Sequence, residues 1–343
     1  QGYGIQLSVN SIRLLNTIGF QGIKSEEKFH PNKLDFYSLK NNKKICDLDI
    51  SVFNTNEAKY TTLQRFTLIN FLKELLPNNL ITYNNKVTQI NYETENIKVI
   101  FENNTSIKCD YLILADGTFS KTKSLIANKE INPQYFNSIA LRATINKENL
   151  KEINLNNISL SLGSNLHTVT YPINNGSHFN FVSIFKKKLT SKQLSDHSLF
   201  ENKGFISSIL SEISKQIDPD IIKNLKDIRC FPIFVSSEVH QPANKNTFLI
   251  GDAFFTLPPT FAQGASQSIE AAYEIYRNLE GETNQFNNER IKRTKMINIK
   301  SKFNYFAFHL SNPLIVWIRD ILMNYLVKNK KFINNYLGKI YKD

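Results

Sequence analysis

Two apolar runs that lie far apart in the chain each end at an acidic residue beside a glycine, and this repeated feature constrains the fold more than any other. The first is YLILADG at 111–117 and the second is FLIGDA at 248–253. A continuously apolar run of this length is typical of a strand buried on both faces of a parallel sheet. Ligands bind beyond the carboxyl ends of such strands, so Asp116 and Asp252 are candidate ligand contacts.

The second of these corners continues into a loop and then a helix. Pro258 and Pro259 stiffen the loop. Gln263-Gly264 begin a helical pattern, and the free N–H groups and positive dipole end of such a helix can stabilise negative charge. Considered alone, Asp252 could equally be the cap of an ordinary strand–loop–helix corner, and the first corner is typical of a simple turn.

Hydrophobic periodicity predicts the remaining elements. Helices are expected over 8–19, 63–76 and 191–214 and, with a break near Pro313, over most of the chain after Glu270. Alternating strands are expected at 80–85, 86–93 and 97–103 as a small antiparallel meander, then repeatedly over 137–186 and at 230–239. The antiparallel block therefore lies between two parallel-type strands, an order that predicts an α/β chain with two interleaved domains.

Charge and cysteine content argue against several classes of function. The formal net charge is +12, but the chain has no Arg-rich block and no nucleic-acid motif, so nucleic acid is not an expected partner. Cys46, Cys109 and Cys230 show no Cys-x-x-Cys spacing, and the histidines form no His-x-x-x-His pair, so neither a metal site nor a disulfide is predicted. A cytoplasmic location is expected.

The stretch from Arg290 to the end of the chain is basic, with twelve Lys or Arg against two acidic residues. Bulky apolar and aromatic residues accompany these charges, so the stretch could contact an anionic membrane surface as a peripheral element. The alternative is a pair of helices that dock on the core and expose a solvated basic face.

Taken together, the two corners resemble the paired signatures of the flavin-dependent aromatic hydroxylases, the group that includes p-hydroxybenzoate, salicylate and ubiquinone-biosynthesis hydroxylases. The later signature, Gly-Asp-Ala…Pro…Gln-Gly, is matched by Gly251, Asp252, Ala253, Pro259, Gln263 and Gly264. The earlier one, Ala-Asp-Gly…Ser, is matched by Ala115, Asp116, Gly117 and Ser120. The segments GYGIQLSVNSIRLL, LQRFTLINFL and LHTVTYPINNGSHFNFVSI are similar to three further family segments, so the matches extend from Gly2 to about Ala272.

The resemblance implies a fold and a division into domains. The expected fold is an α/β, Rossmann-like three-layer FAD-binding domain, interleaved with an antiparallel β-sheet substrate domain and followed by a helical C-terminus. The FAD-binding domain would comprise 1–35, 60–134 and 231–290, and the substrate domain 36–59 and 135–230. The helical region would comprise 291–343.

The resemblance also implies an activity. The chain would be an FAD-dependent monooxygenase that hydroxylates a small aromatic ring or a prenylated quinone precursor with NAD(P)H and O2. A related flavoprotein reductase of the same fold and a catalytically degenerate flavin-fold protein remain alternatives. In this activity Asp252 would hold the ribityl chain, and the helix after Gln263 would direct its positive end at the flavin ring.

The implied site residues fall into two groups, and no catalytic base can be named. The expected cofactor contacts are Gly4, Ile5, Arg65, Val87, Asp116, Gly117, Gly251, Asp252, Pro259, Gln263, Gly264, Ala265 and Ser266. The candidate substrate contacts are His167, Tyr171, Phe254 and Phe255.

The sequence departs from the family pattern in four respects, one being Glu270-Ala271-Ala272 where the family often has Glu-Asp-Ala. Phe254 and Phe255 stand where the family commonly has Ala-His, and Lys123 stands where it usually has Arg. No Gly-x-Gly-x-x-Gly fingerprint occurs, although the family begins with it. We therefore expect that the given chain lacks the first βαβ unit and binds FAD poorly.

Overall fold

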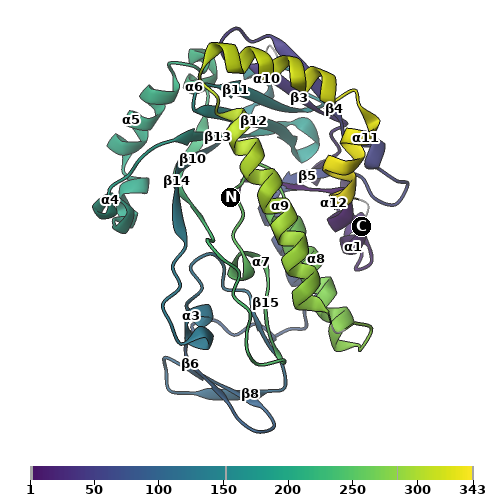
Figure 1. Ribbon diagram of the computed structural model, residues 1–343, viewed down its shortest axis with the longest axis vertical. Coiled ribbons are helices and arrows are strands. Elements are labelled where there is room, and N and C mark those ends of the chain that lie inside the picture. The colour runs from purple at the N-terminus through teal and green to yellow at the C-terminus, as the bar shows by residue number, and fades with distance from the viewer. Residues whose placement is uncertain (1–2, 151–152, 284, 342–343) are drawn as a thin grey trace.

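The computed structural model describes residues 3–150, 153–283 and 285–341. Its largest element is a seven-stranded sheet in the upper half of the molecule (Figure 1). The strand order is β14 (Lys226–Val235), β10 (Gln134–Asn146), β13 (His178–Lys186), β12 (Leu166–Ile173), β11 (Ile158–Gly163), β3 (Lys33–Ser38) and β4 (Lys44–Asp49). All neighbours pair antiparallel except β11 and β3, which run parallel. The predicted antiparallel block is thus confirmed.

Alternation along β10 decides which face of this sheet is covered. Ile139, Leu141 and Ile145 are fully buried and pack in one cluster with Ile209 and Ile213 of α5 (Lys203–Ile213). Because successive strand side chains point to opposite faces, the residues between them face the other way. That second face borders the candidate site described below.

A parallel pair of short strands forms the second layer. β9 (Leu112–Leu114) and β15 (Thr247–Leu249) run side by side, with Leu114 opposite Leu249. The predicted parallel strands are confirmed, but burial of β9 on both faces is wrong. Ile113 is 44% exposed because β9 pairs only with β15 among the described strands, and one face of that pair carries no covering element over Ile113.

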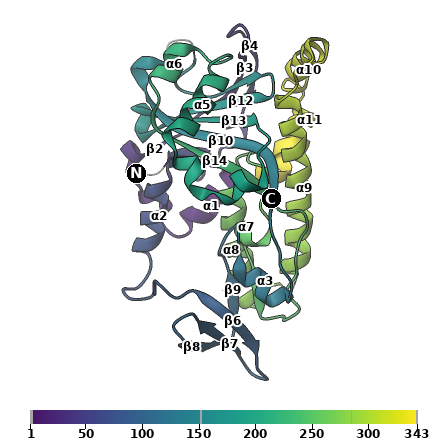
Figure 2. The same ribbon diagram turned by 90° about the vertical axis from the view of Figure 1, so that its left-hand side faces the viewer.

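The small antiparallel β-meander lies below this layer, at the bottom of Figures 1 and 2. It consists of β6 (Val87–Tyr92), β7 (Ile97–Phe101) and β8 (Ser106–Cys109). The prediction of a strand at 80–85 is wrong, because the structure has no strand there. Leu80 and Tyr83 are 62% and 67% exposed, and Asn84 adopts a left-handed φ of 59°, so this stretch has no partner strand and turns instead.

The remaining described elements surround these layers. A third sheet holds β1 (Gly4–Leu7), β5 (Thr61–Gln64) and β2 (Lys28–Phe29). Besides α5, the described helices before the C-terminal group are α1 (Val9–Asn16), α2 (Arg65–Glu74), α3 (Lys121–Ala127), α4 (Ser191–Ser195), α6 (Pro219–Lys223), α7 (Gly251–Phe254) and α8 (Gly264–Leu279). Short 3-10 turns lie at Phe20–Gly22, Ser25–Glu27, Ser51–Phe53, Lys147–Asn149, Asn174–Gly176 and His197–Glu201.

The C-terminal helices form one side of the molecule (Figure 2). They are α9 (Phe286–Phe308), α10 (Pro313–Leu326), α11 (Lys330–Ile333), a π-helical turn (Asn334–Gly338) and α12 (Lys339–Tyr341). Asn312 accepts from the backbone N–H groups of Leu314 and Ile315, and Pro313 occupies the first helical position, so the predicted break at Pro313 is confirmed. Among the described helices, none combines the length and the apolar character needed to cross a bilayer.

The chain is therefore a mixed α/β protein with a large sheet and a helical C-terminus, as the sequence predicts. The numbered division into FAD-binding, substrate and helical regions remains our proposal. Its outermost residues, 1–2 and 342–343, lie outside the described residues, and so does Gly2, where the family matches begin.

Candidate functional site

The two acidic-glycine corners lie next to each other. The N–H of Ile250 donates to the carbonyl of Leu114 at 3.1 Å, which continues the β9–β15 pairing past the strand ends. Beyond it, the Thr118 hydroxyl donates to a carboxylate oxygen of Asp252 at 3.4 Å. These two contacts, between residues 136 and 134 positions apart, bring the corners together in space.

Asp252 keeps hydrogen-bonding capacity for a ligand. Its carboxylate borders a large cavity. Asp252 lies in the first turn of α7, and the residue at the start of α8 is Gln263, so Asp252 does not cap α8. Desolvation by the surrounding protein raises its pKa, while the bond from Thr118 and the charges of Arg65 and Lys123 oppose that shift. A carboxylate with one long hydrogen bond can accept further donors such as sugar-like hydroxyl groups.

Asp116 has a local structural task. One oxygen of its carboxylate accepts from the backbone N–H of Thr122 at 3.3 Å and from the Thr122 hydroxyl at 2.8 Å. Ser120 caps the same helix, α3, by accepting from the N–H of Lys123 at 3.0 Å. Burial lowers the pKa of Lys123, whereas the negative charges of Asp116 and Asp252 raise it. This lysine therefore interacts electrostatically with both corners.

A cavity of about 830 Å³ lies between the second face of the large sheet and the strands, loop and helices opposite it. Ten of the residues expected at the site line it: Gly4, Ile5, Arg65, His167, Tyr171, Asp252, Pro259, Gln263, Gly264 and Ala265. Seven do not: Val87, Asp116, Gly117, Gly251, Phe254, Phe255 and Ser266.

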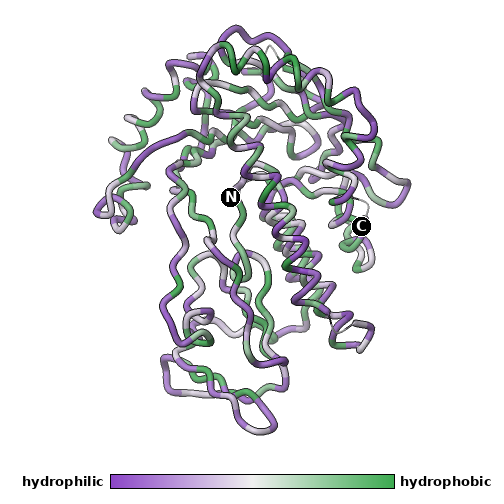
Figure 3. The backbone as a smooth tube through the Cα atoms, in the orientation of Figure 1, coloured by the Kyte–Doolittle hydropathy of each residue, from purple (hydrophilic) through white to green (hydrophobic). Residues whose placement is uncertain are grey.

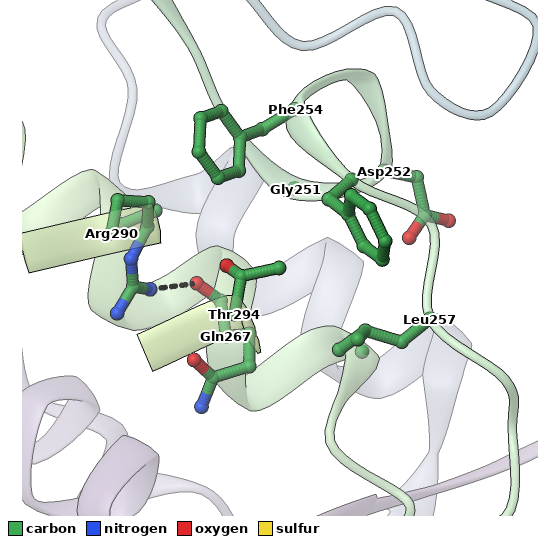
Figure 4. Close-up of a pocket in the computed structure, with 10 residues that line it drawn as sticks. Gly251, Asp252, Phe254, Leu257, Gln267, Arg290 and Thr294 are labelled. Atoms are coloured by element: carbon green, nitrogen blue, oxygen red, sulfur yellow. Dashed lines mark hydrogen bonds between the residues drawn. The ribbon is translucent and has the colours of Figure 1, made fainter. Parts of the chain in front are cut away.

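The placement of Phe254 and Phe255 corrects the expectation that they contact substrate. They are only 2% and 8% exposed and pack with Leu114 and Leu249 under the corner. With Gly251 they border a separate cavity of about 20 Å³, which holds no more than a water molecule (Figure 4). There, Arg290 donates to the carbonyl of Gln267 at 3.1 Å, the dashed line of Figure 4.

Ser266 and Val87 also lie away from the cavity. The hydroxyl of Ser266 lies 3.0 Å from that of Ser8 and 2.9 Å from that of Ser11, so it fastens α8 to α1. Val87 begins β6 in the hanging meander. The resemblance assigned both to the cofactor, whereas the residues of the later signature that line the cavity are Asp252, Pro259, Gln263 and Gly264, followed by Ala265.

The start of α8 presents its dipole to the cavity. No side chain caps this helix, and Gln263 instead donates to the hydroxyl of Ser8 at 3.0 Å. Gly264 and Ala265 line the cavity, so the positive end of a 16-residue helix faces it. Ala262, just before this start, has a φ of +51°, a conformation that side chains with a Cβ rarely adopt.

Gly4 brings β1 unusually close to the large sheet. A Cβ there would lie 2.8 Å from atoms of both Asn180 and Tyr171, and the N–H of Gly4 donates to Asn180 at 2.7 Å. Asn180 is fully buried, and no local pattern in the sequence marked it. Only glycine permits this approach, which places the β1 backbone along the cavity.

Two polar side chains on the sheet face could meet a substrate. Arg142 of β10 lines the cavity, and its charge opposes the upward pKa shift that burial gives Tyr171. His167 of β12 lines the cavity and is 1% exposed. Most of the surrounding wall is apolar, including Val182, Ile184 and Leu160.

His167 belongs to a buried histidine pair that fixes its tautomer. Nε2 of His309 lies 3.2 Å from the carbonyl oxygen of Ile184 and 2.9 Å from Nδ1 of His167. A carbonyl oxygen only accepts, so His309 carries its proton on Nε2, and this single N–H is shared between the Ile184 carbonyl and Nδ1 of His167, which accepts. Neutral His167 therefore carries its own proton on Nε2. Burial lowers the pKa of both rings, that of His309 to about 4, so both are neutral near pH 7.

The histidine pair should make stability sensitive to acid. Each of these histidines has a lower pKa in the folded state than in the unfolded state. As the pH falls from about 6.5 toward the folded pKa, the unfolded chain binds a proton that the folded chain does not, so the free energy of unfolding decreases. Between pH 7 and 4.5 the parent chain should lose about 2–3 kcal/mol more unfolding free energy than His309→Phe, at about 1.4 kcal/mol per pKa unit. Urea denaturation across this range measures the difference. Equal pH dependence in both chains would contradict the buried neutral pair.

No group of three or more metal-ligating side chains occurs in the part of the chain that the structure describes. Four kinds of polar group border the mainly apolar cavity. They are the Asp252 carboxylate, which can accept from hydroxyl groups, the positive end of α8, the cationic side chains of Arg65 and Arg142, and the neutral His167 imidazole, which can donate. These groups suit an organic ligand with sugar-like and aromatic parts.

No family model matches the chain. Salicylate hydroxylase of Pseudomonas putida is 24% identical over 241 residues, which cover 63% of this chain, and the chain spans about half, 54%, of that relative's length. The 3-hydroxybenzoate 6-hydroxylase 1 of Aquipseudomonas alcaligenes is 22% identical over 342 residues, covering 90% of this chain and 80% of the relative.

Solved structures share the fold. Klebsiella pneumoniae HpxO complexed with FAD and uric acid superposes with a TM-score of 0.79 at 14% identity, covering 99% of this chain and 88% of that one. A salicylate hydroxylase substrate complex gives a TM-score of 0.75 at 16% identity, covering 96% and 88%. The chain is therefore similar in sequence to hydroxylases named for salicylate and 3-hydroxybenzoate, and it shares its fold with these solved flavin-binding and aromatic-hydroxylase structures.

Proposed function

We propose that this chain is an FAD-dependent monooxygenase that hydroxylates an aromatic or quinone-precursor ring with NAD(P)H and O2. The observation that carries the proposal is the cavity of about 830 Å³, bordered by Asp252 and the α8 start as well as by the sheet. Cofactor and ligand sites typically occupy about 300–1,000 Å³. The relatives named for salicylate and 3-hydroxybenzoate support a small aromatic substrate.

The bordering residues fit FAD chemically. Asp252 has acceptor capacity for ribityl hydroxyl groups, and Arg65 carries a positive charge on the same cavity wall. The uncapped N-terminus of α8 favours negative charge on a flavin ring without having to reorganise. Once bound, FAD would supply the redox chemistry that takes electrons from NAD(P)H and delivers a hydroxyl group from O2 to the substrate ring.

The sheet face would hold the substrate. His167 would donate from Nε2 to an oxygen substituent of the ring, because His309 already occupies its Nδ1. Arg142 would favour an anionic substituent such as a phenolate or carboxylate. The apolar wall would exclude water from the reacting ring.

The experiment is a flavin titration followed by turnover. We expect added FAD to bind weakly, with quenching of its fluorescence, and NADH or NADPH oxidation to rise when hydroxybenzoates or a quinone precursor are added. The product should be heavier by one oxygen atom by mass spectrometry. Flavin reduction without an oxygenated product would favour a reductase, and absence of FAD binding at millimolar FAD would favour a degenerate flavin-fold protein.

A further inference from the structure

The outer face of α10 is a continuous apolar surface. Its large side chains recur at helical spacing and are exposed: Leu314 (65%), Trp317 (61%), Ile318 (43%), Ile321 (50%), Leu322 (52%) and Tyr325 (67%). Green, hydrophobic residues recur along this helix at the top of Figure 3. We call these six residues the α10 patch. A contiguous exposed patch of this kind marks an interaction surface.

The opposite side of α10 is already docked, so the patch is not a core face that has failed to pack. Arg319 is only 7% exposed and donates to the carbonyl of Ala307 at 3.1 Å, and Asn324 donates to the carbonyl of Ile45 at 3.1 Å. Met323 and Val327 line the large cavity. One helix thickness, about 10 Å, therefore separates the patch from the candidate substrate site.

The charges around α10 select the kind of partner. Exposed Lys328, Lys330 and Lys331 follow the helix, and exposed Lys302 lies on α9. Between 290 and 341 the single acidic residue is Asp320, which is paired with Arg319 at 2.7 Å. Two copies joined through this face would bring lysines against lysines, whereas an anionic surface would attract them.

The wall of the cavity beneath α10 is apolar as well. Phe303 of α9 is 59% exposed and also lines the cavity, and Leu326 and Ile333 line it from α10 and α11. The apolar surface outside and the apolar wall inside are thus formed by the same helices. An apolar ligand would meet favourable contacts on both sides.

We propose that the α10 patch and its flanking lysines rest on an anionic lipid surface, from which the cavity takes an apolar, lipid-dissolved aromatic substrate. Trp317 and Tyr325 are the residue types favoured at the boundary between headgroups and acyl chains. The helix lies in the interface plane and does not cross it, in agreement with its length of 14 residues. Substrate delivery rests on the proposed monooxygenase function, but lipid binding does not.

Flotation of the full chain with vesicles tests the lipid surface. The parent should float with phosphatidylcholine vesicles that contain phosphatidylglycerol, and should float less with phosphatidylcholine alone or in high salt. The double variant Trp317→Glu, Ile321→Glu should lose at least tenfold in partitioning. Replacing Lys328, Lys330 and Lys331 by Gln should lower partitioning to anionic vesicles by about two orders of magnitude, since each such lysine contributes about fivefold.

A matched control distinguishes the patch from general stickiness. Ile107→Glu changes an equally exposed apolar residue, 53% exposed, on the distant strand β8 and should float like the parent. Unchanged melting temperatures would show that the variants fold. Equal flotation of parent and patch variant overturns the proposal, and so does a lipid-free dimer that the patch variant abolishes.

A second arm separates this inference from the function. With vesicle-dissolved substrate the patch variant should lose turnover, while a short water-soluble analogue should be hydroxylated as by the parent. Because flotation needs neither FAD nor turnover, its failure would leave the proposed oxygenase standing. Absence of hydroxylation by a chain that floats would instead remove the function and leave the lipid surface.

Discussion

Replacing Glu270 by alanine should lower the free energy of unfolding by about 3–5 kcal/mol, the usual cost of breaking a buried ion pair. Glu270 is 6% exposed in α8 and accepts from Arg293 at 2.7 and 3.1 Å and from Arg290 at 3.3 Å. Asn10 of α1 also donates to it. The substitution leaves Arg293 without a carboxylate partner and Arg290 with Glu274 alone, at 2.9 Å. Burial of the Arg293 charge without a partner is the larger part of the cost.

The network also explains why the cost should extend to the C-terminus. Arg293 donates to the carbonyl of Lys339 at 2.5 Å and to that of Ile340 at 2.7 Å. Glu270 orients this arginine, so α1, α8, α9 and α12 share one set of bonds. We expect the Glu270→Ala chain to show faster amide exchange or proteolysis near Ile340 before global unfolding.

The matched control is the exposed pair Lys86–Glu102. Its side chains are 68% and 63% exposed, so Glu102→Ala should change the unfolding free energy by less than about 1 kcal/mol despite the 2.6 Å separation. Urea denaturation of both variants at pH 7 measures the contrast. A Glu270→Ala chain as stable as Glu102→Ala would show that the buried network contributes little.

Local patterns in the sequence predicted the parts of the fold that local physics decides. The runs at 111–117 and 248–253 combine a strand-length apolar segment with a glycine that permits a sharp turn, and both became strands that end at corners. Gly251 shows why the glycine is needed: its φ is +56°, and an added Cβ would lie 2.7 Å from the Ser268 hydroxyl. Such requirements act within a few residues and are visible in the chain itself.

What the sequence did not predict depends on contacts between distant residues. His167 and His309 are 142 positions apart, and neither neighbourhood carries a sign of the other. The position of Phe254 in the signature led to the prediction that it contacts substrate. In the structure the short helix α7 directs its ring into the core. Similarity identifies which segment approaches a ligand, whereas packing decides which side chain of the segment faces it.

Replacing Asp252 by alanine should weaken FAD binding about 10- to 100-fold, because a hydrogen bond to a charged group contributes about 1.5–3 kcal/mol. Of the two acidic corner residues, Asp252 borders the cavity and Asp116 does not. The Thr118 hydroxyl donates a hydrogen bond to the Asp252 carboxylate at 3.4 Å. Loss of the carboxylate removes the acceptor for a ligand hydroxyl but leaves the packing of Ala253 and Phe254 beneath it unchanged. Fluorescence titration with FAD gives the ratio of dissociation constants.

Two further variants make that result specific. Asp252→Asn keeps one acceptor oxygen and loses the charge, so its FAD affinity should lie between those of the parent and Asp252→Ala. Asp110→Ala removes an exposed carboxylate just before β9 and should bind FAD within about twofold of the parent, since it alters charge only at the exposed surface. If Asp110→Ala and Asp252→Ala weakened FAD equally, the effect would be one of net charge, and the corner formed by β15 and α7 would not be the cofactor site. If neither altered binding while NAD(P)H oxidation persisted, the carboxylate would have no role in holding the ribityl chain, and the uncapped start of α8 would remain the stronger determinant.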